Sequence, residues 1–124
     1  MTVIRKPTVI NPSAIKKKGD ENTLTLHLQV DAEIEDFKGH FPQFALLPGV
    51  TQIDWAVHYA QQLFDSPKSF QSMEVIKFQE PILKDTLVKL TLTWHADKQK
   101  LHFSYTSGQD DEVRTHSSGR ILLG

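Results

Sequence analysis

The feature that most constrains this chain is one helix-like stretch, Val50 to Phe64, in a sequence whose other patterned segments indicate strands. Its apolar residues cover most of a helical circumference rather than a single stripe. They are Val50, Ile53, Trp55, Ala56, Val57, Tyr59, Ala60, Leu63 and Phe64. A helix that is apolar nearly all round is normally buried. We therefore predict one buried central helix, covered by a sheet that wraps around it or by a partner subunit.

Strand patterns lie on both sides of this helix. From Thr23 to Val30, leucine and valine alternate with polar residues, which predicts a strand with one buried face. Thr8 to Lys18 is weakly extended and would pair with it as a hairpin. Four more strands are predicted at hairpin spacing: Phe70–Phe78, Leu87–His95, Leu101–Thr106 and Val113–Leu122. The fold class is therefore α+β, a curved antiparallel sheet wrapped around one long central helix, which is the hotdog arrangement.

The composition of the chain excludes several classes of function and of site. The 124 residues suit a single domain, residues 1–124. Lys and Arg number 14 against 15 Asp and Glu, so no basic excess exists for nucleic-acid binding. The absence of cysteine excludes disulfides, thiolate metal sites and Cys nucleophiles. No apolar run is long enough to span a membrane, and the N-terminus lacks a signal-peptide pattern, so we expect a cytoplasmic protein.

Two groups that can move protons, His40 and Asp54, lie on either side of a Pro48-Gly49 corner. A partly desolvated neutral imidazole at His40 would make a good general base near neutral pH. Asp54 lies one turn into the helix, where a buried carboxylate needs a partner or a proton. Structural readings remain open: His40 bonded to backbone, and Asp54 stabilised by the helix dipole or paired with His58.

The helix start supplies a third element. The free N–H groups of the first turn, from Gly49 and Val50, would point at a developing anion, although Pro and Gly are also common at ordinary helix starts. A base, an acid and backbone donors on an apolar channel suit removal of a proton next to a carbonyl. The donors would hold the enolate while the acid protonates a leaving hydroxyl.

The same residues carry a family resemblance. Gly39-His40-Phe41-Pro42, Leu47-Pro48-Gly49-Val50 and Gln52-Ile53-Asp54 resemble the signature of β-hydroxyacyl-(acyl carrier protein) dehydratases, which have the hotdog fold. Further along, Lys77-Phe78, Pro81-Ile82, Asp85 and Leu87 are similar to a second motif of that family. The resemblance covers roughly Phe37 to Trp94.

The resemblance implies dehydration of 3-hydroxyacyl-(acyl carrier protein) to the trans-2-enoyl product, in fatty-acid or polyene-type lipid biosynthesis. His40 would take the α-proton, Asp54 would protonate the hydroxyl, and the Gly49 N–H would bind the thioester oxygen. No cofactor is implied beyond the phosphopantetheine arm of the carrier protein. The family forms dimers in which the His of one subunit faces the acid of the other, so we expect a homodimer with interfacial sites. A higher oligomer or a heterodimer stays open.

Several residues depart from the family pattern. The acid is Asp rather than the commoner Glu, Ala45 stands where proline is usual, and Lys84 replaces a glycine. Trp55 and His58 are bulkier than the small residues common after the acid, which indicates a reshaped substrate tunnel. These features are closest to small dehydratase-like proteins of aryl-polyene or other specialised lipid pathways. The residues predicted to bind substrate are Gly49, Val50, Phe41, Leu47, Trp55 and His58.

Two other functions stay open. In a hotdog thioesterase, Asp54 would activate water and His40 would have no obvious role. A non-catalytic hotdog subunit would bind acyl chains or pair with an active homologue.

The remaining histidines are expected to face solvent from the strands; they are His27, His95, His102 and His116. None has metal-ligand spacing, so no metal is predicted. An acidic carrier protein would need a basic docking area, unless the basic residues are scattered solubilising charges. The candidates are Lys38, Lys77, Lys84, Arg114 and Arg120.

Overall fold

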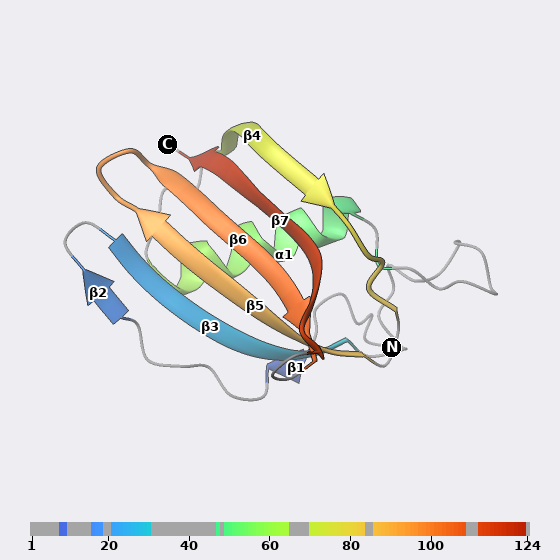
Figure 1. Ribbon diagram of the computed structural model, residues 1–124. Coiled ribbons are helices and arrows are strands. Elements are labelled where there is room, and N and C mark those ends of the chain that lie inside the picture. The colour runs from blue at the N-terminus through green and yellow to red at the C-terminus, as the bar shows by residue number, and fades with distance from the viewer. Residues whose placement is uncertain are drawn as a thin grey trace, which may run out of the picture.

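The computed structural model describes residues 8–9, 16–18, 21–30, 47, 49–64, 70–83, 86–108 and 112–123 of the chain. Its elements are β1 (Thr8–Val9), β2 (Lys16–Lys18), β3 (Glu21–Val30), α1 (Gly49–Leu63), β4 (Phe70–Phe78), β5 (Thr86–His95), β6 (Lys100–Ser107) and β7 (Arg114–Leu123). The strands form one antiparallel sheet in the order β1-β3-β5-β6-β7-β4, with β2 also paired to β3 (Figure 1). The predicted strands and the hairpin before the helix are confirmed within one or two residues at most ends.

The centre of the sheet follows directly from the alternation of side chains. β3 and β5 pair without a bulge from Glu21↔His95 to Val30↔Thr86, so the inward residues of both strands fall on the same face. There Leu24 lies opposite Leu92, and Leu26 opposite Leu90. Each of these leucines is at most 2% exposed, and burial of such a side chain contributes roughly 1.5–3 kcal/mol.

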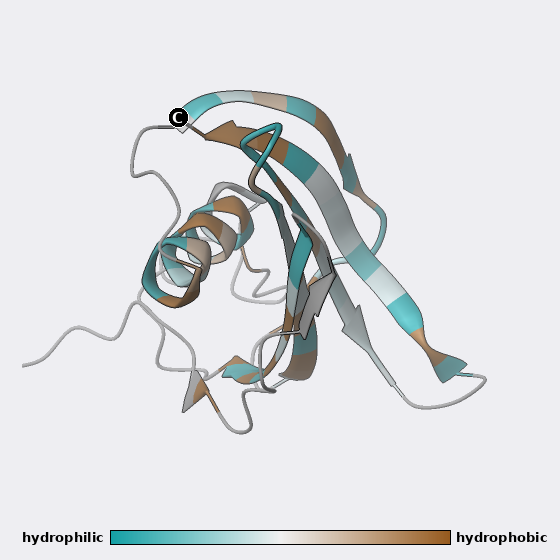
Figure 2. Ribbon diagram, turned by 90° about the vertical axis from the view of Figure 1, so that its left-hand side faces the viewer, coloured by the Kyte–Doolittle hydropathy of each residue, from teal (hydrophilic) through white to brown (hydrophobic). Residues whose placement is uncertain are grey.

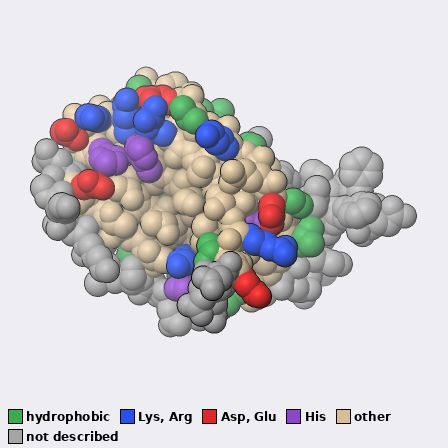
Figure 3. Space-filling view, in the orientation of Figure 1, with side chains coloured by type: hydrophobic (Ala, Val, Ile, Leu, Met, Phe, Trp, Pro, Cys, Tyr) green, Lys and Arg blue, Asp and Glu red, His purple; other side chains and the backbone are tan. Residues whose placement is uncertain are grey.

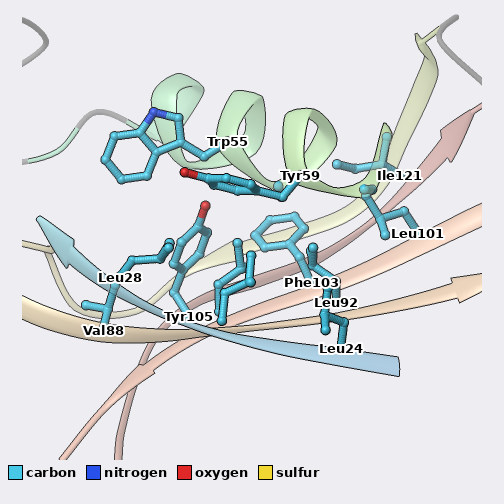
Figure 4. Packing of buried hydrophobic residues seen from close by; sticks show 14 of the residues in the cluster. Leu24, Leu28, Trp55, Tyr59, Val88, Leu92, Leu101, Phe103, Tyr105 and Ile121 are labelled. Atoms are coloured by element: carbon cyan, nitrogen blue, oxygen red, sulfur yellow. The ribbon is translucent and has the colours of Figure 1, made fainter. Parts of the chain in front are cut away.

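The helix α1 packs against this apolar face, as the edge-on view in Figure 2 shows. Its inward side chains include Trp55, Ala56, Tyr59 and Ala60, all of which belong to the core. Figure 4 shows Trp55 and Tyr59 of the helix above Tyr105 and the aliphatic residues of the sheet. The sheet thus holds one face of the helix in a fixed orientation, which determines where its opposite face points.

The sheet alone does not bury α1 on all sides, so of the two predicted sources of cover it supplies only part. Asp54, Gln62 and Leu63 are exposed, because the sheet covers only one side of the helix. Ile53 and Val57 are only partly buried at the margin of the core. The apolar surface that remains fits the second expectation, cover by a partner subunit, which stays a prediction.

The strand after the helix, β4, is the last strand of the sheet, and among the described strands it pairs only with β7. Its exposed side chains are both polar and apolar, and the large apolar ones are Met73 (51%), Val75 (45%) and Phe78 (54%). From Met73 to Val75, β4 advances by two residues while β7 advances by one, so Glu74 is an extra, bulged residue. Glu74 is held by Lys100 at 3.1 Å and by Arg120 at 2.8 Å. Within the described part of the chain, the outer edge of β4 has no pairing strand and exposes three large apolar side chains, a surface that natural proteins usually cover.

Candidate active site

The residue before the helix start is firmly anchored. Leu47 is 3% exposed, and its backbone N–H donates a 2.8 Å hydrogen bond to the carbonyl of Ile82. Its own carbonyl accepts a 3.1 Å hydrogen bond from the side-chain amide of Gln52. Ile82 is fully buried and belongs to the second predicted motif. The two motifs identified in the sequence therefore meet through Leu47 and Ile82.

Gly49 begins α1 beneath the ring of Phe78, from the edge strand β4. A Cβ added at Gly49 would lie 2.6 Å from Cζ of Phe78, so no side chain fits there unless the ring moves. The first N–H groups of a helix have no intrahelical partner and attract developing negative charge. The missing side chain of Gly49 lets the Phe78 ring pack directly against this helix end as an apolar wall.

Asp54 projects from the exposed side of α1, five residues after Gly49. The negative charge of Asp54 also affects the pKa of a tyrosine in the core, Tyr105. Burial is the main cause that raises the pKa of Tyr105 well above its usual value, and the charges of Tyr59 and Asp54 raise it further. Burial also raises the pKa of Tyr59 to about 12. Both phenols therefore stay protonated at neutral pH, and Figure 4 shows their hydroxyls turned toward the same space below α1.

Other predicted site residues occupy different places. Trp55 is fully buried in the core, and His58 is half-buried with its ring edge-on to Tyr59 at 5.1 Å. Val50 lies in the first turn of α1. His40 and Phe41 lie outside the described residues, so the distance from His40 to Asp54 is not part of this structure. The substrate-binding roles of Trp55 and His58 stay predictions.

The prediction that His116 faces solvent is wrong. It is 6% exposed, and its Nδ1 lies 3.1 Å from the carbonyl oxygen of Pro81, while its Nε2 lies 2.7 Å from Oγ of Ser107. A carbonyl only accepts, so Nδ1 carries the proton and Nε2 accepts from the serine. The cause is a β-bulge: Tyr105 pairs with Ser117 but Thr106 pairs with Thr115, which makes His116 the extra residue.

The bulge breaks the alternation on which the prediction relied. His116 and Ser117 are consecutive, yet both are buried. The sequence signal that could have found them is weak, since Thr115 to Ser118 is polar throughout. His27, His95 and His102 are partly exposed, and His95 and His102 lie with ring centroids 4.6 Å apart. Figure 3 shows histidines next to Lys and Arg on the sheet face turned away from α1.

Two of the basic residues that were predicted to dock a carrier protein are paired with carboxylates in the structure. Arg120 contacts Glu74, and Arg114 lies 3.9 Å from Glu80. Lys77 lines a hollow of about 400 Å³ on the outer sheet face, together with His102 and Arg120. Lys38 and Lys84 lie outside the described residues. Among the described residues, no three His, Asp or Glu side chains gather as metal ligands.

Comparison with known proteins decides the family. The sequence profile of the ApeI-like family, described as ApeI dehydratase, matches residues 16–120. The chain belongs to the ApeI-like dehydratase family. This confirms the predicted resemblance to hotdog dehydratases. A search of curated proteins finds no match for this ApeI-like chain.

Solved structures agree. An uncharacterized protein from Erwinia carotovora subsp. atroseptica is 44% identical, with a TM-score of 0.87 over 95% of both chains. The dehydratase heterocomplex ApeI:P from Xenorhabdus doucetiae contains a chain that is 36% identical, with a TM-score of 0.78 over 94% of this chain and 96% of that one. A bifunctional dehydratase-cyclase domain in ambruticin biosynthesis, 17% identical with a TM-score of 0.58 over 99% of this chain and 46% of its own, shares the fold.

The hotdog fold is thereby confirmed for this ApeI-like dehydratase. In the described residues, no helix is both long enough and apolar enough to cross a membrane.

Proposed function

We propose that this ApeI-like dehydratase removes water from 3-hydroxyacyl chains carried on the phosphopantetheine arm of an acyl carrier protein. The product is the trans-2-enoyl thioester, made for a polyene-type or other specialised lipid in the cytoplasm. The observation that carries the proposal is the exposed Asp54 on the same rigid helix as the bare Gly49 start. An acid and a set of oxyanion donors are thus fixed relative to each other.

In the proposed reaction, the Gly49 N–H holds the thioester oxygen and so stabilises negative charge that develops when the α-proton leaves. His40 takes that proton. The electron pair of the C–H bond forms the new double bond, and the C–O bond at the β-carbon breaks. Asp54 gives its proton to the departing hydroxyl, which leaves as water. Both residues return to their starting protonation states when a proton passes from His40 to Asp54 through solvent.

We further propose that the working unit is a homodimer joined near β4, with sites between subunits. Three features support it: the unpaired β4 edge, its exposed Met73, Val75 and Phe78, and the exposed side of α1. Phe78 contacts Gly49, so the dimer surface and the helix start adjoin each other. An acyl chain entering between two subunits would be enclosed by apolar groups and the reaction shielded from water.

A second candidate rests on one comparison. The Xenorhabdus doucetiae relative is part of a dehydratase heterocomplex, ApeI:P. This chain could by analogy pair with a different hotdog subunit that completes the site. The same β4 edge would then receive that subunit.

The test is an assay of the purified chain with 3-hydroxyacyl-(acyl carrier protein), in which enoyl thioester, free acid and free thiol are all measured. Enoyl product alone supports the homodimeric dehydratase. Enoyl product only after a second hotdog subunit is added supports the heterocomplex. Free acid and thiol without enoyl product would move the protein to the thioesterases and contradict the proposal.

A further inference from the structure

The residue that joins the helix start to the sheet is Gln52, in the first turn of α1. Its side chain is 3% exposed, and it carries no part of the proposed proton transfers. It nevertheless forms hydrogen bonds to three other parts of the fold. Nε2 donates to the Leu47 carbonyl at 3.1 Å, and Oε1 accepts from the hydroxyl of Ser117 at 2.6 Å. Its backbone carbonyl accepts from the Tyr105 hydroxyl at 2.6 Å.

These three hydrogen bonds come from three different parts of the fold. Leu47 precedes the helix, Tyr105 lies on β6, and Ser117 lies on β7. Ser117 and Tyr105 are both fully buried, so their hydroxyls have no solvent to exchange with. Leu47 is held at its other end by the 2.8 Å hydrogen bond from its N–H to Ile82. Both polar groups of the Leu47 backbone are therefore fixed, and one of them depends on Gln52.

We propose that Gln52 is a positioning residue for the dehydratase reaction, which aligns the Gly49 N–H by holding Leu47 against β7. The inference rests on the proposed function, because it concerns the oxyanion donor of that mechanism. Only one residue, Pro48, separates Leu47 from Gly49 in the sequence, and each peptide unit is planar, so a tilt at Leu47 passes to the helix start. A displacement of about 1 Å at a reacting group can cost on the order of 10²-fold in rate.

The chemistry of the amide explains why glutamine suits this position. One end must donate, because the Leu47 carbonyl only accepts. The other end, Oε1, accepts the proton that the Ser117 hydroxyl donates. A leucine would fill similar space in the core, and a buried amide is costly unless both ends are bonded. The two hydrogen bonds of the Gln52 amide thus fix the orientation of Leu47 relative to β7, which apolar packing alone would not fix.

The test compares Gln52→Leu and Gln52→Glu with Gln29→Leu, a matched change at a partly exposed position of β3. Each variant is assayed for kcat and KM with a 3-hydroxyacyl thioester, for cooperative unfolding, and for backbone hydrogen exchange over residues 47–52. We expect Gln52→Leu to fold cooperatively, to lose kcat by about 10²-fold with KM within about threefold, and to exchange faster in this segment. Gln29→Leu should match the wild type in all three.

Gln52→Glu supplies the conservative rescue. The introduced carboxyl can replace both hydrogen bonds only when protonated, as a donor through its O–H and an acceptor through its carbonyl oxygen. Its kcat relative to wild type should therefore rise as the pH falls from about 8 to about 5, since burial favours the protonated form. Wild-type kcat retained in Gln52→Leu, or a Gln52→Glu deficit that does not change with pH, would overturn the proposal.

Hydrogen exchange separates this proposal from the proposed function. If the wild type forms no enoyl product, the reaction assignment fails, and exchange over residues 47–52 still reports the positioning. Unchanged exchange in Gln52→Leu would then overturn the role of Gln52 by itself. Faster exchange would support the proposal that Gln52 positions Leu47, for whatever reaction the site performs.

Discussion

The phenol of Tyr105 on β6 donates a 2.6 Å hydrogen bond to the backbone carbonyl of Gln52 in α1. This contact joins strand β6 of the sheet to the first turn of the helix, close to the helix start at Gly49. Tyr105 is fully buried, so its hydroxyl cannot exchange this partner for water. The contact is long-range in sequence, and it fixes the distance between helix and sheet at the end where the candidate site lies.

Tyr105→Phe should remove this bond with almost no change in shape. We expect a loss of about 1 kcal/mol in the free energy of unfolding, because an intramolecular hydrogen bond has about that net value. Urea denaturation of the two proteins measures the difference. A variant as stable as wild type would show that the Tyr105–Gln52 bond does not contribute to stability.

Stability should fall in alkaline solution because of the same tyrosines. The folded-state pKa of Tyr59 is about 12 against an ordinary 10.0, and that of Tyr105 is raised as well. The unfolded chain therefore loses phenolic protons first, so the stabilisation is complete below about pH 10 and is lost as the pH rises above it. Tyr59→Phe should flatten the fall in unfolding midpoint between about pH 10 and 12. Equal slopes for wild type and variant would contradict the assignment.

Gly49→Ala should test the contact between the helix start and β4. The added Cβ would lie 2.6 Å from Cζ of Phe78, and the ring, 54% exposed, can move away. We therefore expect a stability change below about 1 kcal/mol but a loss of kcat of tenfold or more, since the wall beside the oxyanion donor shifts. Phe78→Ala removes the same wall without a clash, so it should lose kcat to a similar extent. Wild-type kcat in Phe78→Ala would exclude displacement of the ring as the cause.

His116→Phe should destabilise the fold. The change removes part-buried hydrogen bonds to the Ser107 hydroxyl and the Pro81 carbonyl, and each such bond has a net value of about 0.5–1.5 kcal/mol. His27→Phe, on a partly exposed position of β3, is the control and should stay within about 0.5 kcal/mol of wild type. Urea unfolding compares the two. If His116→Phe is as stable as the control, the hydrogen bonds of His116 carry no net stability.

The contrast between β3 and β7 shows how far the sequence alone could go. Leu24 to Val30 alternate without interruption and pair with β5 in unbroken register, so the buried face followed from side-chain period. His116 could not be placed in that way, because a bulge in β7 shifts the period by one residue. This bulge is set by the pairing of β7 with β6, and the polar run from Thr115 to Ser118 does not mark it.

The candidate site also contains features that the sequence predicted and features that it could not predict. The motif spacing predicted that Gly49 and Asp54 belong to one helix, and the structure agrees. The link from Leu47 to Ile82 was not predictable, because it joins backbone groups 35 positions apart whose side chains give no polar signal. Nor was the role of Gln52 apparent, since a glutamine in an otherwise apolar helix is equally typical of a solvated face. Its partners, Ser117 and Tyr105, are identified only by the fold.

The most direct test of the account is subunit complementation between His40→Ala and Asp54→Asn. Each variant alone should form almost no enoyl product, because each lacks one proton-transfer group. Equal amounts, unfolded together and refolded, should recover about a quarter of wild-type activity, since half of randomly formed dimers contain one intact site out of two. Mixed protein that stays inactive would contradict a site shared between subunits, and activity in Asp54→Asn alone would contradict the role of Asp54.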